Sequence, residues 1–322
     1  MAAGALESRP LGSAGMDVSV MSLGSWRTFE RLPADTRVAI MRAARDEGIN
    51  FFDDARYNDE TGAAPIPTGY SEVVFGELFR GAGVPRDQAV VANKLWWEFW
   101  PEQSAAAELD ASLQRMGFDY VDVIYANPPP EGMPVADAVA ATVALIGSGK
   151  ARAWGLVNWH AQQAQRAVRA AADLGVAQPC AIQLPYSLVR RDWVEDPEMA
   201  RVLDVSGAGL IASFSLAGGV LSGKYLAGPA AGRAAETLDD PRVAPAAAAA
   251  RDLASLATRL GTTPAVLALA FPFTHPALAS VLFGATSPEQ VRADCAAAGL
   301  LGRLAPGDLA ELRRIGARDE SR

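Results

Sequence analysis

The sequence predicts a closed (β/α)8 barrel, in which eight parallel strands are each followed by a helix. The chain has 322 residues, of which 50% are hydrophobic and 20% are charged, enough apolar surface for one large core. Short apolar runs rich in Val, Ile and Phe alternate with longer segments whose apolar residues recur every three or four positions. Polar residues stand at the ends of several runs. Eight such units in roughly 300 residues match one barrel, so we expect residues 1–322 to form a single domain with a core at about 9–316.

The predicted strands are short and evenly distributed along the chain. They lie at residues 20–23, 49–52, 89–92, 121–125, 153–157, 181–184, 210–214 and 280–283, and helices are expected between them, for example at 35–47, 101–116, 134–148 and 160–174. Residues 9–18 carry two glycine turn signals between apolar pieces, which favours a small hairpin at the floor of the barrel. The long segments 58–70 and 226–246 are expected to be lids or binding loops.

Composition narrows the class of ligand. The net charge is −8, from 37 acidic and 29 basic residues, and no polybasic patch would attract nucleic acid or an anionic membrane. No apolar stretch approaches the roughly 20 residues of a membrane span, and the N-terminus lacks a signal-type segment, so we expect a cytoplasmic protein. Two cysteines, Cys180 and Cys295, and two histidines leave almost no ligands for a metal, so we expect no metal site and two buried thiols.

Polar side chains end several of the apolar runs, at the edge where barrel enzymes place their chemistry. They are Asp53 and Asp54 after the second run, Asn93 and Lys94 after the third, Asn127 after the fourth, Asn158 after the fifth and Gln183 in the sixth. Any one of them is as readily an ordinary surface residue, but together they favour a site. A buried charge needs a partner, so we expect Asp53 to pair with Lys94. Tyr57 follows on the same rim, and a phenol beside an ammonium has its pKa lowered.

A family pattern covers the chain from about Arg9 to about Gly316. It consists of LGSAGMDVSVMSLGSW (11–26), GINFFDDARY (48–57), GYSEVVFGELF (69–79), VVANKLWW (90–97), MGFDYVDVIYAN (116–127), SGKARAWGLVNW (148–159), LAGGVLSGKY (216–225) and SVLFGATSPEQ (280–290). The order and spacing of these stretches resemble the aldo-keto reductase superfamily. The YVDVIYANPP segment and the tryptophan-rich loop after Lys94 are similar to the branch that includes the β subunits of voltage-gated potassium channels and related bacterial reductases.

The resemblance implies an enzyme that uses NADPH to reduce aldehydes and ketones to alcohols by hydride transfer. Tyr57 would protonate the carbonyl oxygen, Lys94 would depress the pKa of the tyrosine, and Asp53 would hold Lys94 charged and oriented. Asn127 stands where the family usually has histidine, as in the potassium-channel branch, and its amide could donate a hydrogen bond to the substrate. The rim residues Trp26, Trp96 and Trp97 would line a pocket for apolar or aromatic carbonyl substrates, although a single tryptophan is more often core.

The same resemblance assigns a cofactor site. Asn158 and Gln183 would bind the nicotinamide carboxamide, with Ser25, Trp26 and Asp53 beside the ring. The pyrophosphate would lie against the loop that follows the seventh strand and two cations further on, namely Ser213, Phe214, Ser215, Leu216, Ala217, Gly218, Lys224 and Arg233. Gly284, Thr286 and Gln290 would surround the adenosine 2′-phosphate at a helix N-terminus. Residues 287–290 also form a helix start with a serine cap, a proline and a capping-box glutamine, and both interpretations can hold together.

Three further departures from the family pattern leave alternatives open. Tyr57 is one residue closer to Asp53 than is usual, so Tyr70 is the alternative acid. Ser213 replaces the aromatic residue that commonly stacks on the nicotinamide, with Phe214 next to it. Asp294 stands near the adenosine end, where a carboxylate would repel a phosphate.

Two other functions remain open at this level. One is a slow-turnover NADPH-binding regulatory or redox-sensing protein of the potassium-channel β-subunit type. The other is a barrel with unrelated carboxylate chemistry, such as a lyase or hydrolase. The expected partner is a small carbonyl compound, and assembly into a homo-oligomer is left open.

Overall fold

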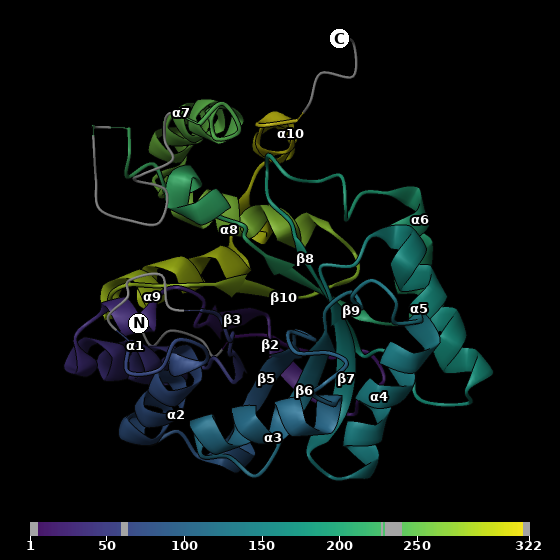
Figure 1. Ribbon diagram of the computed structural model, residues 1–322. Helices are drawn as coiled ribbons and strands as arrows, with labels where there is room; N and C mark the ends of the chain where they lie inside the picture. Colours follow the sequence, from purple (N-terminus) through teal and green to yellow (C-terminus); the bar gives the residue numbers. More distant parts are fainter. Residues whose placement is uncertain (1–5, 59–63, 227, 229–239, 318–322) are drawn as a thin grey trace.

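Eight parallel strands close into a barrel, which confirms the predicted fold (Figure 1). The computed structural model describes residues 6–58, 64–226, 228 and 240–317. Around the barrel the strand order is β10-β3-β4-β5-β6-β7-β8-β9. The strands are β3 (Met21–Gly24), β4 (Phe51–Asp53), β5 (Val90–Leu95), β6 (Val121–Ala126), β7 (Ala151–Val157), β8 (Ala181–Pro185), β9 (Gly209–Ser213) and β10 (Leu278–Phe283).

Helices surround the strands, with α1 and α2 at the left and lower left of Figure 1, α3 to α6 along the lower and right-hand side, and α7 and α10 above. They are α1 (Ala34–Asp46), α2 (Tyr70–Ala82), α3 (Ala105–Met116), α4 (Val135–Gly147), α5 (Ala161–Asp173), α6 (Pro197–Ser206), α7 (Ala244–Leu260), α8 (Pro264–Ala270), α9 (Pro288–Asp294) and α10 (Pro306–Arg314). The helix expected at 101–116 begins only at residue 105, because the Ser104 hydroxyl accepts a hydrogen bond from the Ala107 N–H and caps it there.

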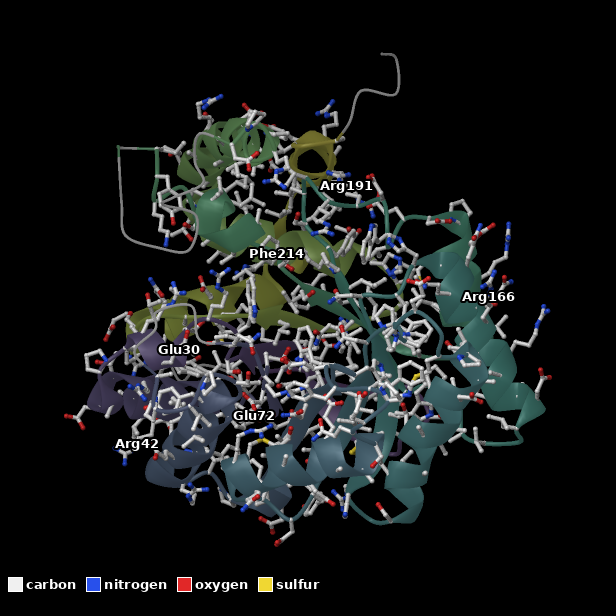
Figure 2. All side chains as sticks on the ribbon, in the orientation of Figure 1. Glu30, Arg42, Glu72, Arg166, Arg191 and Phe214 are labelled. Carbon is white, nitrogen blue, oxygen red and sulfur yellow. The ribbon has the colours of Figure 1, made fainter. Side chains whose placement is uncertain are left out.

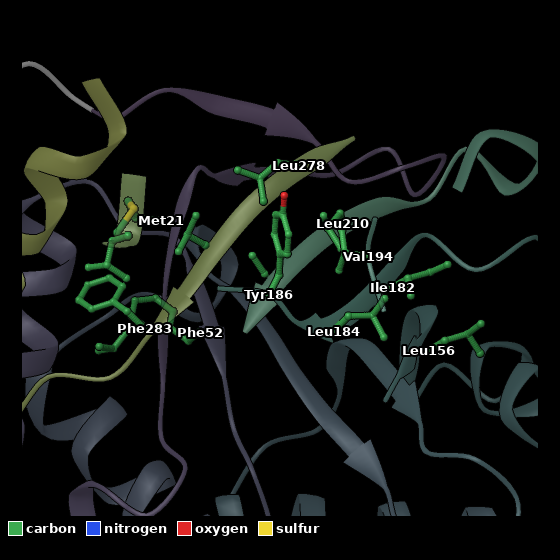
Figure 3. Packing of buried hydrophobic residues seen from close by; sticks show 14 of the residues in the cluster. Met21, Phe52, Leu156, Ile182, Leu184, Tyr186, Val194, Leu210, Leu278 and Phe283 are labelled. Atoms are coloured by element: carbon green, nitrogen blue, oxygen red, sulfur yellow. The ribbon is translucent and has the colours of Figure 1, made fainter. Parts of the chain in front are cut away.

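Strand residues alternate between two apolar layers. Phe51 points into the barrel, whereas Phe52 packs outward with the residues that face the helices. Figure 3 shows part of this outer layer, with side chains from β3, β7, β8, β9 and β10 packed together. Both cysteines are buried free thiols, as expected. The outer layer fixes the helices, and the inner layer fills the barrel below the site.

A hairpin covers the floor of the barrel, as the glycine signals predicted. Strands β1 (Ser8–Pro10) and β2 (Asp17–Ser19) pair antiparallel. Leu11 and Val18 are fully buried in the same cluster as the inward-facing Phe51. The backbone comes so close to the barrel that a Cβ on Gly12 would lie 2.4 Å from the Cys180 carbonyl oxygen, so only glycine fits there. The accessible end of the barrel is therefore the opposite one.

The described segments contain neither a single helix suited to span a membrane nor a metal-binding cluster. No single helix in them has the length and apolar composition of a membrane span, although the sharply bent pair formed by α7 and the segment from Pro264 to Thr274 would reach both values together. Within the same segments no group of three or more His, Cys, Asp or Glu side chains could hold a metal ion.

Candidate active site

A cavity of about 940 Å³ opens at the carboxyl ends of the barrel strands. Its walls come from loops after β3, β4, β5, β7, β8, β9 and β10, so residues far apart in sequence meet there. The volume is at the upper end of the range for ligand pockets, about 300–1,000 Å³. It therefore has room for a large ligand.

The lining of this cavity carries more positive than negative charge, although the whole chain has a net charge of −8. Its cations are Arg27, Arg31, Lys94, Arg190 and Lys224, and its described carboxyl groups are those of Asp53 and Asp294. A concave surface with cationic walls concentrates anions by focusing the field. The site therefore suits a ligand that carries phosphate groups. Among these cations, Arg27, Arg31 and Arg190 were not anticipated by sequence reasoning.

Backbone strain is concentrated around this mouth. The described residues other than glycine with positive φ are Arg27, Trp97, Asn158, Phe214 and Ala217, with φ between 48° and 61°. All of them lie in loops that follow barrel strands β3, β5, β7 and β9. Such conformations cost about 1–3 kcal/mol each and persist where the surroundings hold them, which is typical of functional sites.

At the base of the cavity, Asp53, Lys94 and Gln183 form one hydrogen-bonded group. The Lys94 ammonium donates to Asp53 Oδ1, and it also donates to the Asp54 carbonyl oxygen at 3.0 Å. Gln183 Nε2 donates to Asp53 Oδ2 at 2.8 Å. The side chains of Asp53 and Lys94 are only 4% and 7% exposed, so the predicted ion pair is confirmed and is largely desolvated. All three residues lie within strands rather than after them, because pairing makes inward-facing charge tolerable.

A second polar group, around Asp54, lies between the barrel wall and helices α2 and α3. Asp54 is fully buried and accepts hydrogen bonds from the Ser25 hydroxyl at 2.7 Å and from Asn93 Nδ2 at 3.3 Å. Burial, reinforced by the nearby Glu72 carboxylate, raises the pKa of Asp54 well above its ordinary value. Ser25 was expected at the cofactor, but its hydroxyl instead fixes this carboxyl group and the Ala55 N–H, and it does not line the cavity.

Tyr57 lies beside Glu30 and outside the cavity lining. After Asp53 the chain presents Ala55 to the cavity, and Tyr57 does not line it. Burial and the neighbouring Glu30 carboxylate raise the pKa of Tyr57, so the expected lowering by Lys94 is wrong in direction. In a nonhelical segment one residue more or fewer changes the side on which a side chain emerges, which explains why the shortened spacing redirects the phenol. Tyr70 begins α2, packs against the core and does not line the cavity.

Asn127 also turns away from the cavity. Its side-chain Nδ2 donates to the Leu95 carbonyl oxygen at 3.0 Å, and its backbone carbonyl oxygen accepts from Trp97 Nε1 at 2.9 Å. Neither Asn127 nor Trp97 lines the cavity, and both are buried. Asn127 was expected to donate to the substrate and Trp97 to contact the substrate. Their positions do not match these expectations, because both side chains make hydrogen bonds between the chain after β5 and the chain after β6.

A buried salt bridge, missed by sequence reasoning, holds the tryptophan-rich loop after β5. The Glu108 carboxylate accepts from the backbone N–H groups of Trp96 and Trp97, at 2.7 and 3.2 Å. Arg56 Nη2 donates to the same carboxylate at 2.6 Å and Arg56 Nη1 donates to Glu98 at 3.0 Å. Burial raises the pKa of Glu108. This anchoring presents Trp96, 38% exposed, to the cavity. The only feature of the sequence that could have indicated this salt bridge was a glutamate on the inner face of a predicted helix.

The loop after β9 forms one wall of the cavity. Gly218 and Gly219, with φ of 69° and 96°, lie in the short 3-10 helix η3 (Ala217–Ser222) and line the cavity. Without side chains, they bring the backbone close to the cavity, although the Gly219 N–H already donates to the Leu216 carbonyl oxygen at 2.9 Å. Phe214, labelled in Figure 2, is 41% exposed, and its ring lies 6.1 Å from that of Trp26 on the loop after β3. Two aromatic faces thus meet across the mouth.

After β10, which neighbours β9 in the barrel, α9 begins as the sequence suggested, with a small difference. The Ser287 hydroxyl accepts from the Gln290 N–H, and Pro288 is the first helical residue. The Gln290 side-chain oxygen accepts hydrogen bonds from the N–H and the hydroxyl of Thr286, at 2.7 and 3.0 Å. In the expected capping box it would have accepted from the N–H of Ser287, the next residue. Asp294 ends α9 and lines the cavity, and burial raises its pKa to about 7.

Comparison with known proteins decides the family. A family model described as the aldo/keto reductase family matches residues 20–316, a span that includes every barrel strand and every described residue of the cavity lining. The chain belongs to the aldo/keto reductase family. The reductase is thus an oxidoreductase built on a (β/α)8 barrel, as the order of the sequence stretches predicted.

Two plant relatives align with the reductase over nearly its whole length. A rice (Oryza sativa subsp. japonica) protein named probable voltage-gated potassium channel subunit beta is 32% identical over 316 residues, which cover 94% of each chain. An Arabidopsis thaliana protein of the same name is 30% identical over 325 residues, which cover 96% of each chain. The predicted similarity to the potassium-channel branch is confirmed.

Most of the predicted cofactor residues meet in the reductase's cavity. Those that line it are Trp26, Asp53, Asn158, Gln183, Ser213, Phe214, Ser215, Leu216, Gly218, Lys224, Gly284, Thr286 and Gln290. Ser25 and Ala217 do not line it, and Arg233 lies outside the described residues. Strand order alone brings this set together, since the carboxyl ends of all eight strands share one end of the barrel.

Proposed function

We propose that this reductase uses NADPH to reduce small aldehydes and ketones to alcohols. The observation that carries the proposal is the cavity itself, because a cationic wall lies beside the buried Asp53–Lys94–Gln183 group. A bound reduced nicotinamide would supply the hydride. The chain's own residues would orient the carbonyl group, exclude water from it and supply a proton to its oxygen.

The donor groups that line the cavity suit a dinucleotide. Asn158 and Gln183 present amide groups for the nicotinamide carboxamide. The Gly218 backbone, which carries no side chain, and the Lys224 ammonium line the cavity and would face the pyrophosphate. The exposed Phe214 ring could pack against the nicotinamide in place of the missing aromatic at Ser213. The Trp26 and Trp96 rings favour apolar or aromatic substrates over highly charged ones.

The direct test is consumption of NADPH, followed by absorbance, with a panel of aliphatic and aromatic aldehydes. We expect turnover with several aldehydes, and tighter binding of NADPH than of NADH in a fluorescence titration. Absence of nucleotide binding would contradict the proposal and would bring forward the unrelated carboxylate chemistry considered from sequence. Equal dissociation constants for the two nucleotides would contradict only the preference for NADPH.

Asp294 should make NADPH binding depend on pH. Its pKa of about 7 means that the carboxyl group is mostly neutral at pH 6 and mostly ionised at pH 8. If the adenosine 2′-phosphate lies beside α9, ionisation repels it, so affinity falls as pH rises through 7. We expect Asp294→Asn to bind NADPH on the order of tenfold more tightly than wild type at pH 8, about 1.4 kcal/mol, and equally tightly at pH 6.

NADH serves as the matched control for Asp294, because it has no 2′-phosphate. Its dissociation constant should be similar in wild type and Asp294→Asn at both pH values. The phosphate itself titrates near pH 6, so the comparison of variants at one pH isolates the carboxyl group. An equal gain for NADH and NADPH would show that Asp294 acts on the fold and not on the phosphate.

A second candidate function is suggested by the names of the two plant relatives, which are channel β subunits. In it, the protein binds NADPH tightly and turns over slowly, serving as a regulatory or redox-sensing subunit. Asn127 motivated this alternative from sequence, and its amide is engaged with the Leu95 carbonyl oxygen. Tight NADPH binding together with very slow turnover of every aldehyde would favour it.

A further inference from the structure

We propose that the carbonyl substrate of this reductase carries a carboxylate group, and that Arg190 binds this group. The inference rests on the proposed carbonyl reduction and names its substrate class. That class is an aldehyde or ketone whose apolar or aromatic body bears one negative charge. Arg190 lines the cavity on the chain that follows β8.

The order of the strands places Arg190 on the nicotinamide side of the cavity. In the barrel, β8 lies between β7 and β9. Asn158 directly follows β7 and Gln183 lies in β8, so the two amides proposed for the nicotinamide carboxamide come from the same part of the wall as Arg190. The residues proposed for the adenosine 2′-phosphate follow β10, two strands away from β8. Because hydride transfer takes place at the nicotinamide, the substrate must lie on the side where Arg190 lies.

The other cations of the wall have places in the site that does not include the substrate. Lys94 pairs with Asp53 at the base of the cavity, and Lys224 follows β9 with the segment proposed for the pyrophosphate. Arg27 and Arg31 follow β3, which pairs with β10, so they emerge next to the chain proposed for the 2′-phosphate. Arg190 is therefore the cation that a bound dinucleotide leaves for a second ligand.

The Arg190 guanidinium is positioned by a ring and is not neutralised by a carboxylate. Its central carbon lies 5.1 Å from the ring centroid of Trp193, which also lines the cavity and whose ring lies 4.1 Å from that of His160. Within the described part of the chain, the Arg190 side chain forms no ion pair and no hydrogen bond. Packing against an aromatic face leaves the charge and the planar fork of N–H donors in place. This fork matches the two oxygens of a carboxylate.

Hydrogen bonds fix the turn that carries Arg190. The Ser187 N–H donates to the Arg190 carbonyl oxygen at 3.0 Å, and the Arg190 N–H donates to the Ser187 carbonyl oxygen at 3.2 Å. The next side chain, that of Arg191, does not line the cavity and instead donates to the carbonyl oxygens of Leu188 and Ile315, both at 3.0 Å. A cation on a backbone that is already ordered loses less conformational entropy when it binds a ligand.

The aromatic residues of the wall set the rest of the substrate. Trp26 and Trp96 face the cavity from the chain after β3 and β5, and Trp193 adds a further ring beside Arg190. Such faces bind a flat apolar body. One carboxylate on that body agrees with a wall that disfavours highly charged substrates, because a single cation remains for it.

The deciding experiment compares meta- and para-carboxybenzaldehyde with their methyl esters, which keep the ring and remove the charge, as substrates of the full-length protein with NADPH. We expect wild type to have a higher kcat/KM for at least one acid than for its ester. In Arg190→Gln, kcat/KM for that acid should fall on the order of 10- to 100-fold, mainly through KM, while the value for the ester stays within about twofold. Arg190→Lys keeps the charge without the fork, so it should lose less.

Arg166→Gln is the matched control. It removes the same charge from an exposed position of α5, labelled in Figure 2 and outside the cavity lining. This variant should keep the wild-type kcat/KM for acid and ester. Arg190 is also exposed, so thermal unfolding of its variants should match that of wild type.

Three outcomes would overturn the inference. They are a wild type that prefers neither acid over its ester, an acid-to-ester ratio of kcat/KM that Arg190→Gln leaves unchanged, and an NADPH dissociation constant that rises about tenfold or more in Arg190→Gln. The last outcome would assign Arg190 to a phosphate of the nucleotide. A wild type that binds no nucleotide, or that reduces neither acids nor esters, would show instead that the proposed function is wrong, and the inference would fall with it.

Discussion

Replacement of Asp53 with alanine is expected to abolish most of the proposed reductase activity and to destabilise the barrel. The Asp53 carboxylate accepts from both Lys94 and Gln183, and its side chain is 4% exposed. Without the Asp53 carboxylate, the Lys94 ammonium remains buried from water and loses its oppositely charged partner. Removal of one member of a buried ion pair costs about 3–5 kcal/mol of folding free energy. Displacement of a charged group at the base of the cavity should also lower the rate, by about 10²–10⁴ if proton transfer depends on that group.

Chemical denaturation and NADPH consumption measure the two effects of Asp53→Ala separately. Asp110→Ala is the matched control, because Asp110 also pairs with a lysine, Lys150, but the two side chains are 51% and 35% exposed. Exposed pairs contribute about 0–1 kcal/mol, so this variant should unfold nearly as wild type does and keep its activity. Equal losses in the two variants would contradict the special role of burial at Asp53.

Replacement of Gly76 with alanine is expected to be the most damaging single methyl addition at a helix contact. Gly76 lies in α2, and a Cβ placed on it would be 2.0 Å from the Met116 carbonyl oxygen at the end of α3. Both groups belong to the backbone of packed helices, so neither can move aside by changing a rotamer. Overpacking of this kind costs about 3 kcal/mol, and we expect a comparable loss in the free energy of unfolding.

The Gly76→Ala change should also disturb the candidate active site. Glu72, also in α2, accepts from Asn93 Nδ2 at 3.0 Å, and Asn93 precedes Lys94 in β5. A displaced α2 would disturb that contact, so kcat of Gly76→Ala should fall as well. Gly147→Ala is the control, since a Cβ at this last residue of α4 meets no atom within 4 Å. It should leave activity unchanged and raise stability by up to about 1 kcal/mol. Equal stability of both variants would contradict the expected clash.

The sequence predicted structure correctly where a local residue pattern agrees with a general rule of folding, such as the alternating burial of strand residues or the pairing of buried charges. The apolar runs became strands within a few residues of their predicted bounds, because alternating burial in a barrel imposes the same residue types in any context. Asp53 and Lys94 met because charges that close apolar strands must be compensated. Gln290 joined a cap at α9, because capping is local chemistry, although its side chain bonded Thr286 while its backbone N–H bonded Ser287.

Prediction failed where a side chain's direction depends on distant partners. Nothing near Tyr57 in the chain shows that Glu30 lies beside its hydroxyl, or that Arg56 reaches across to Glu108. Asn127 stands at the position in sequence expected for a substrate-binding residue. Its side chain is not oriented toward the cavity, because its amide donates to the Leu95 carbonyl oxygen. These contacts join loops that follow different strands, and no periodicity encodes them.

By itself, the order of residues determined the eightfold barrel, the end at which chemistry lies and the Asp53–Lys94 pair, since each follows from hydrophobic periodicity or from the cost of burying charge. Only the tertiary structure decided which polar groups reach the cavity. Loop side chains turn toward whichever partners the closed barrel brings near them, and here those partners drew Tyr57 and Asn127 away and left Lys94 facing the ligand space.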